Sequence, residues 1–200
     1  MAHARCTAGI SMAVEAGFDM IAHCVMARPD EAYEFDPRVA ERLIEKRVWV
    51  NPTLAIWQSK VRFLRAKARQ EKLTSDEEME LAKGEKGILE RRDECRRLRQ
   101  MGARFVAGSD CGWGVYPFGY FAREVQALGE VGLSPLEAIA AGTSDAARAL
   151  NIFDKVGSLE AGKEADVLVV RGDPARDLSA LADVLAVFKA GQKIEAGKGG

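Results

Sequence analysis

The chain of 200 residues carries a formal net charge of −1, and 48% of its residues are hydrophobic and 30% charged. This length suits one well-formed core with a small appendage, and the near-neutral charge argues against a dedicated nucleic-acid binder. There is no run of about 18 apolar residues for a transmembrane helix, no signal-peptide core after Met1, and no CxxC pair among the four cysteines, so a cytoplasmic protein with reduced thiols is expected.

Short apolar runs alternate with amphipathic segments through the first half of the chain. Apolar residues at helical spacing predict helices, and brief apolar runs between turn signals predict strands. The predicted elements are helices over Thr7–Glu15 and Asp36–Lys46 and strands over Phe18–Ala22, Val48–Val50 and Phe105–Ala107. The charged stretch Lys60–Met101 predicts two helices with a break near Leu73–Asp76. Its basic run Lys60–Lys72 is followed directly by acidic residues, which favours a solvated helix face over a nucleic-acid site.

The last part of the chain changes from helical to β-rich character. The remaining predicted elements are helices over Phe121–Gly129, Ser134–Ala141 (opened by a capping box) and from Thr143 or Ser144 to Leu150, and β segments over Ala165–Val170, Val184–Phe188 and Gln192–Ile194. Strands that alternate with helices imply a parallel sheet. Ala165–Val170 and Val184–Ile194 follow the last of these helices and carry a hairpin-like turn, so they are expected to pair with each other outside that sheet.

Three side chains that can bind a metal ion are each expected at the carboxyl end of a strand. His23 and Asp110 each follow a predicted strand. His3 is expected to follow another strand, whose own sequence is cut off. In α/β barrels this is the edge where ligands and catalytic groups lie. Two imidazoles and one carboxylate suit zinc or a similar divalent ion. The alternatives are histidines without a special role and an Asp110 that closes an Asx turn.

The loop after this aspartate is rich in glycine and aromatic residues. Trp113, Tyr116 and Tyr120 either line a substrate pocket or pack against the core. Cys24 and Cys111 leave open a thiol hydrolase in which a cysteine acts with a histidine. Alkylation of these two thiols would test that alternative, since small buried cysteines are also ordinary core residues.

Seven stretches carry a family resemblance: His3–Arg5 with Gly9, Ile10 and Ala13; Ala16–His23; Val50–Leu54; Ala107–Asp110; Gly132–Ala138; Thr143 with Ala146–Leu150; and Val156–Asp166. They resemble the C-terminal half of the metal-dependent amidohydrolase superfamily, in its imidazolonepropionase-like and prolidase-like branch. The resemblance covers nearly the whole chain apart from Lys60–Met101, and the last stretch is the most specific.

This resemblance implies a (β/α)8 barrel in which His3 and His23 follow the fifth and sixth strands and Asp110 follows the eighth. Members of the family bind one or two divalent metals with these residues, a His-x-His pair after the first strand and often a carboxylated lysine or a glutamate after the fourth. The present sequence contains no His-x-His, and no strands precede His3. The resemblance therefore implies a fragment of an enzyme of about twice this length.

The predicted fold is α/β: strands five to eight of a TIM barrel with their helices over residues 1–150, and strands of a small β-sandwich appendage over residues 151–200. The implied function is hydrolysis of carbon–nitrogen bonds in amides, cyclic amides or dipeptides, with zinc as the expected metal and Asp110 as general base. The expected partners are a small-molecule substrate and the missing N-terminal half. Homo-oligomerisation is left open, and binding to nucleic acid or a membrane is not expected. The alternative is a non-catalytic or split-gene half. Because four strands leave open sheet edges, the chain alone is expected to be inactive.

Overall fold

A parallel four-stranded sheet lies at the centre of the computed structural model, which describes residues 1–28, 30, 32–112 and 115–195. Its strands are β1 (Ala2–Ala4), β2 (Met20–His23), β3 (Trp49–Asn51) and β4 (Arg104–Phe105). They lie side by side in sequence order, and the register pairs Ile21 with Val50 and Val50 with Phe105. This arrangement confirms the expectation of an α/β fold with a parallel sheet.

The strand boundaries differ from those predicted, for reasons of backbone hydrogen bonding. His3 lies within β1 and not after it, since the ladder to β2 continues through Ala4. β4 comprises Arg104–Phe105; the N–H of Val106 still donates to the carbonyl of Val50 in β3 at 2.9 Å, and the N–H of Ala107, on the other side of the chain, donates to the carbonyl of Ala141 at 2.9 Å. His23 is the last residue of β2 and not the first residue after it.

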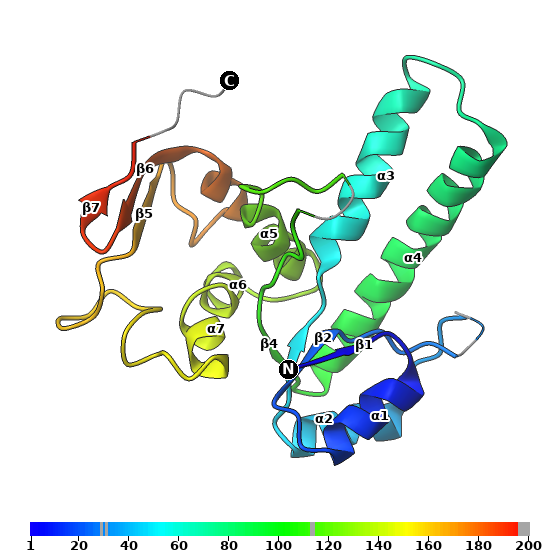
Figure 1. Cartoon of the computed structure of the whole chain (residues 1–200), viewed down its shortest axis with the longest axis horizontal. Helices are drawn as coiled ribbons and strands as arrows, with labels where there is room; N and C mark the ends of the chain where they lie inside the picture. The colour runs from blue at the N-terminus through cyan, green and yellow to red at the C-terminus, as the bar shows by residue number, and fades with distance from the viewer. Residues whose placement is uncertain (29, 31, 113–114, 196–200) are drawn as a thin grey trace.

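The helices flank the sheet in two groups. Their bounds are α1 (Thr7–Glu15), α2 (Pro37–Glu45), α3 (Leu54–Ala68), α4 (Ser75–Gln100), α5 (Ala122–Glu130), α6 (Pro135–Ala141) and α7 (Ser144–Ala149). Figure 1 shows α1 and α2 together at one end of the sheet, while α3 and α4 form a long hairpin that extends away from it. The capping box before α6 forms as predicted, with Ser134 and Glu137 bonded to each other's backbone N–H.

The hairpin of α3 and α4 confirms the two helices expected in the charged stretch, with the break at the predicted place. However, α3 begins at Leu54 and not at Lys60. The two helices cross closely at Gly84, where an added Cβ would lie 2.8 Å from Cγ2 of Val61. A larger side chain at this position would force the helices apart.

A second, antiparallel sheet follows the last helix. It consists of β5 (Val167–Val170), β6 (Val184–Lys189) and β7 (Gln192–Lys193), with the 3-10 helix η1 (Leu178–Ala182) between the first two strands. No strand of this sheet pairs with the described parallel strands, which confirms that these segments pair with each other outside the parallel sheet. In Figure 1 it lies on the far side of α6 and α7 from the hairpin.

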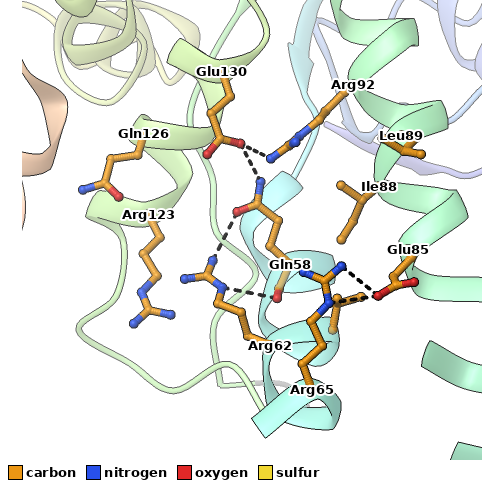
Figure 2. Close-up of a pocket in the computed structure, with 11 residues that line it drawn as sticks. Gln58, Arg62, Arg65, Glu85, Ile88, Leu89, Arg92, Arg123, Gln126 and Glu130 are labelled. Carbon is orange, nitrogen blue, oxygen red and sulfur yellow. Dashed lines mark hydrogen bonds and ion pairs between the residues drawn. The ribbon is translucent and has the colours of Figure 1, made fainter. Parts of the chain in front are cut away.

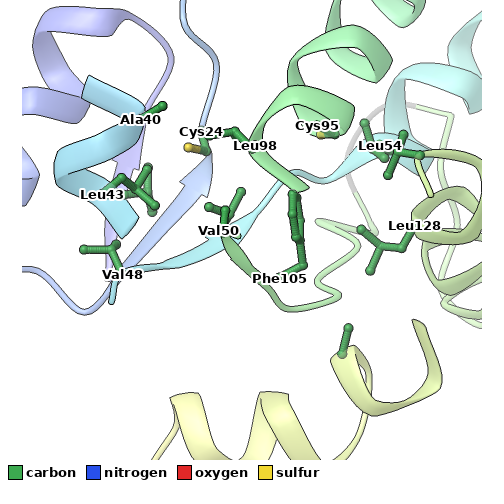
Figure 3. Packing of buried hydrophobic residues seen from close by; sticks show 14 of the residues in the cluster. Cys24, Ala40, Leu43, Val48, Val50, Leu54, Cys95, Leu98, Phe105 and Leu128 are labelled. Atoms are coloured by element: carbon green, nitrogen blue, oxygen red, sulfur yellow. The ribbon is translucent and has the colours of Figure 1, made fainter. Parts of the chain in front are cut away.

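One large hydrophobic cluster joins the parallel sheet to the helices on its flank. Figure 3 shows Val50 and Phe105 of the sheet, Leu43 of α2, Leu98 of α4 and Leu128 of α5 turned toward a common interior. These side chains are at most 5% exposed, so the cluster fixes where the strand ends lie relative to α3 and α5. In the part of the chain that the structure describes, no helix is long and apolar enough to span a membrane.

Candidate functional site

The two histidines of the chain meet at the carboxyl end of β1 and β2. Parallel pairing sets Ala4 opposite His23 and His3 opposite Ala22. The imidazole rings of His3 and His23 are 4.5 Å apart between centroids and are inclined at 69°, edge toward face. Adjacent strands in register therefore place two nitrogen-bearing rings in contact at one edge of the sheet.

Backbone strain collects at the same edge. Non-glycine residues with positive φ are uncommon, and a β-branched residue there is an outlier. Four of the seven described examples follow or end strands of the parallel sheet: His23 (+66°), Cys24 (+43°), Thr53 (+48°) and Asp110 (+50°). Such strain persists only where the surroundings impose it, and it is concentrated in active sites. The backbone thus points to this edge as a functional region.

Thr53 fixes the orientation of the His23 ring. Its Oγ1 lies 2.9 Å from Nδ1 of His23, and the threonine is 2% exposed. When Nδ1 carries the proton and donates it to this hydroxyl, the lone pair of Nε2 is left free to bind a ligand. In metal-binding histidines, the hydrogen-bond partner of the other ring nitrogen sets the tautomer. Nothing in the local sequence signals this contact, because the two residues are on different strand ends.

Glu124 of α5 explains why the Thr53 hydroxyl is free for His23. Thr53 precedes α3 but makes no side-chain cap, and the carboxylate of Glu124 accepts instead from the N–H groups of Leu54 (2.9 Å) and Ala55 (2.7 Å). Glu124 is fully buried, and burial raises its pKa to about 7 against the opposing effect of the two backbone bonds. A carboxylate distant in sequence therefore caps α3 at its positive end.

The electrostatics of the edge favour a neutral His23. Burial of the ring, followed by the charge of His3, lowers the pKa of His23 from its ordinary 6.5, while the carboxylate of Asp110 raises it. Neutral imidazole is the form that binds metals and accepts protons. Asp110 therefore lies within electrostatic range of His23, and it is exposed to solvent.

Asn51 adds a polar group that the sequence analysis missed. It ends β3, and its buried Oδ1 has no hydrogen-bond partner among the described residues. The amide lies directly against Gly108, where an added Cβ would be 2.4 Å from its Nδ2. An unsatisfied buried acceptor is costly in a native structure and calls for an explanation. A ligand that donates to Oδ1 would supply one.

The donor set at this edge fits part of a divalent-metal site. Two imidazoles in contact, one with its Nδ1 held by Thr53, offer the nitrogen donors that zinc prefers. Within residues 1–28, 30, 32–112 and 115–195, however, no group of three or more His, Cys, Asp or Glu side chains is placed to hold a metal ion. His3 and His23 are therefore a pair that other ligands would have to complete.

The aromatic residues of the loop after Asp110 have different surroundings. Trp113 lies outside the described residues. Tyr116 is 1% exposed, packs against Ala55 and Ile56, and donates its hydroxyl to the carbonyl of Tyr120 at 2.8 Å. This placement favours the packing alternative for Tyr116. The ring of Tyr120 is partly exposed and lies under the guanidinium of Arg123.

The surroundings of Cys24 are not those of a nucleophile. Cys24 is 3% exposed, and burial together with the charge of Glu94 raises the pKa of its thiol well above the ordinary value. A reactive cysteine requires a lowered pKa and access to solvent. Cys111 packs against the cluster around Tyr116. The thiol hydrolase alternative therefore finds no support at Cys24.

Comparisons with known proteins agree on one family. A model of the amidohydrolase family matches residues 1–194. An imidazolonepropionase from Desulfotalea psychrophila is 37% identical over 65 residues, 31% of this chain and 16% of that protein, and one from Symbiobacterium thermophilum is 40% identical over 77 residues, 38% of this chain and 18% of that protein.

The solved structures show how much of such a protein this chain spans. A Xaa-Pro dipeptidase with bound methionine in its active site aligns with a TM-score of 0.76 and 28% identity, over 98% of this chain and 44% of that one. A putative prolidase from Bifidobacterium longum aligns with a TM-score of 0.74 and 25% identity, over 96% of this chain and 46% of that one. The chain therefore spans less than half the length of these structures.

Proposed function

Because this chain belongs to the amidohydrolase family, we propose that it forms part of a metal-dependent hydrolase that cleaves carbon–nitrogen bonds in amides, cyclic amides or dipeptides. The observation that carries this proposal is the contact of His3 with His23 at 4.5 Å, with Nδ1 of His23 held by Thr53. The strained backbone at His23, Thr53 and Asp110 supports the same location.

Each residue of the candidate site has a proposed role. His3 and His23 would bind the metal ion through imidazole nitrogens, and Asp110 would take part in binding it. A divalent ion there, with zinc as the expected metal, supplies the Lewis acidity that makes water nucleophilic near neutral pH. Asp110 would accept the proton of the attacking water and pass it to the leaving nitrogen, as general base and then general acid. Tyr120 is the remaining candidate for a substrate contact in the described part of the loop.

The fold supports the proposal that this chain is one half of a barrel. Four parallel strands in sequence order, joined by helices, fit strands five to eight of a (β/α)8 barrel, which we assign to residues 1–150. The antiparallel strands β5–β7 would then belong to an appendage over residues 151–200. An N-terminal half with a His-x-His pair would complete both the barrel and the metal ligands.

A specific observation favours a second candidate, a split half that acts only with a partner chain. The described residues offer the two imidazoles but no third ligand in place. β1 also forms one edge of the parallel sheet, and a sheet edge can pair with another strand. A second copy of the chain or a separate N-terminal half could cover this edge.

Zinc content and turnover, measured together, test the function. We expect residues 1–200 alone to bind zinc weakly and to hydrolyse no member of a panel of dipeptides and cyclic amides. Addition of an N-terminal half that carries His-x-His should raise both readouts, and His23→Ala should abolish the gain. Full turnover by residues 1–200 alone that survives His23→Ala would show that the site has been assigned wrongly. A gain in neither readout after assembly would contradict the hydrolase proposal.

A further inference from the structure

We propose that a cleft between α3, α4 and α5 binds the phosphate group of a small phosphorylated molecule. The cleft has a volume of about 500 Å³ and contains none of the residues proposed for hydrolysis. We call it the arginine cleft, after the residues that define it: Arg62 and Arg65 of α3, Arg92 and Glu85 of α4, and Arg123 and Glu130 of α5. Figure 2 shows these side chains converging from the three helices.

The arginine cleft holds more positive than negative charge. Arg65 pairs with Glu85 at 2.8 Å, and Arg92 pairs with Glu130. The other two of its four guanidinium groups have no carboxylate at ion-pair distance among the described residues. Arg62 donates to Oε1 of Gln58 at 3.1 Å, and Arg123 stacks on a tyrosine ring. Within the described residues, two positive charges in the cleft therefore have no ion-pair partner, although the charge of Glu130 acts on Arg62.

The two unpaired cations differ in exposure, since Arg62 is exposed to solvent and Arg123 is partly buried. Partial burial, and next the charge of Arg123, lower the pKa of Arg62 from its ordinary 12.5, while the charge of Glu130 opposes them, so the two unpaired groups repel each other and Glu130 offsets only part of this repulsion. Nε of Arg92 is also enclosed by protein and has no acceptor among the described residues. A buried donor without a partner costs free energy. An anion in the cleft would relieve both the repulsion and the unsatisfied donor.

The chemistry of the cleft favours phosphate over a single carboxylate. A phosphate monoester carries about −1.5 to −2 charges at pH 7 on one compact group, which balances the two unpaired guanidinium groups, whereas one carboxylate balances one and succinate spreads two charges over separate groups. The planar guanidinium donates two parallel hydrogen bonds to phosphate oxygens. Val61, Ile88 and Leu89 line another part of the cleft, and its volume lies within the range of about 300–1,000 Å³ for small-molecule sites. The organic part of a phosphate ester therefore has room beside apolar side chains.

Calorimetric titration of the purified protein at constant ionic strength tests this inference. The probes are glycerol phosphate, inorganic phosphate and succinate. We expect saturable binding of glycerol phosphate and inorganic phosphate, and weaker binding of succinate. Arg62→Gln and Arg123→Gln should each raise the dissociation constant about tenfold or more, because each removes a charged donor. The matched control is Arg69→Gln, which removes the same charge from an exposed position at the end of α3, outside the cleft.

A variant with the opposite expected effect separates binding from misfolding. Glu130→Gln removes a negative charge from the cleft and releases Arg92, so it should tighten phosphate binding on the order of threefold or more. Circular dichroism checks that each variant is folded. Phosphate without saturable heat, equal dissociation constants for wild type and Arg62→Gln, or succinate binding as tightly as phosphate would each overturn the inference. None of these results depends on hydrolase activity.

Discussion

The buried carboxylate that caps α3 makes the stability of the protein depend on pH in a defined window. Glu124 is 0% exposed, and its pKa rises from an ordinary 4.5 to about 7 in the folded protein. Since the folded state holds this proton more tightly than the unfolded chain, the stabilisation is complete below about pH 4.5 and is lost as the pH rises to about 7. The loss amounts to about 3 kcal/mol for this group.

The variant Glu124→Gln isolates this contribution because glutamine titrates in neither state. The quantity to follow is the difference in unfolding free energy, wild type minus variant. We expect this difference to fall by about 3 kcal/mol between pH 4.5 and 7 and to be constant below and above that range. A constant offset of about 1–3 kcal/mol is expected as well, because the glutamine amide cannot accept from both Leu54 and Ala55. The slope with pH, and not this offset, tests the reasoning.

Urea denaturation followed by circular dichroism at pH values from about 3.5 to 8 measures both quantities. Glu41→Gln on α2 is the matched control, since Glu41 is exposed and makes no hydrogen bond or ion pair that could change with its charge in the described structure. Its difference from wild type should be flat across the same range. A flat difference for Glu124→Gln would refute the argument that this carboxyl group is buried and protonated more readily in the folded state.

Two further substitutions test the backbone and the histidine pair. Gly157→Ala should lower the unfolding free energy in urea by about 1–3 kcal/mol, because Gly157 has a φ of +93° and its Cβ would lie 2.6 Å from that of Ala147; an unchanged denaturation midpoint would contradict this. In the assembled protein, Thr53→Val should weaken zinc binding in a chelator competition about 10–100-fold by removing the partner of His23, whereas Thr53→Ser should retain the affinity. Equal zinc affinity for both variants would show that the hydroxyl does not position the ring.

The elements that sequence analysis located correctly have their determinants close together in the chain. α1 follows from helical spacing alone, and α2 begins after Asp36, whose side chain accepts from the N–H of Arg38. The capping box of Ser134 and Glu137 likewise lies within four consecutive positions. The carboxyl ends of the parallel strands could also be predicted approximately, because polar residues follow short apolar runs. In each case the energetic reason for the boundary could be read within a few residues.

The start of α3 was missed because its cap comes from another helix. No local cap after Asn51-Pro52-Thr53 predicts the first turn of α3, because Glu124 satisfies its first N–H groups from α5. Beyond β4, the partner of the predicted strand residue Ala107 is also distant in sequence, since its N–H donates to Ala141 of α6. These contacts join residues far apart in sequence, so no local pattern could have predicted them.

The same non-local cap connects the interior of the protein to the candidate site. If Thr53 capped α3 with its own hydroxyl, as a threonine at this position ordinarily does, its Oγ1 would bond to the backbone of α3 and not to His23. Glu124 takes over the capping, and Thr53 adopts a left-handed conformation with its hydroxyl 2.9 Å from Nδ1 of His23. The strain at Thr53 and the burial of a carboxyl group both cost free energy. A protein retains such costs where they serve function, and here both costs place one hydroxyl against the ring that we propose binds the metal.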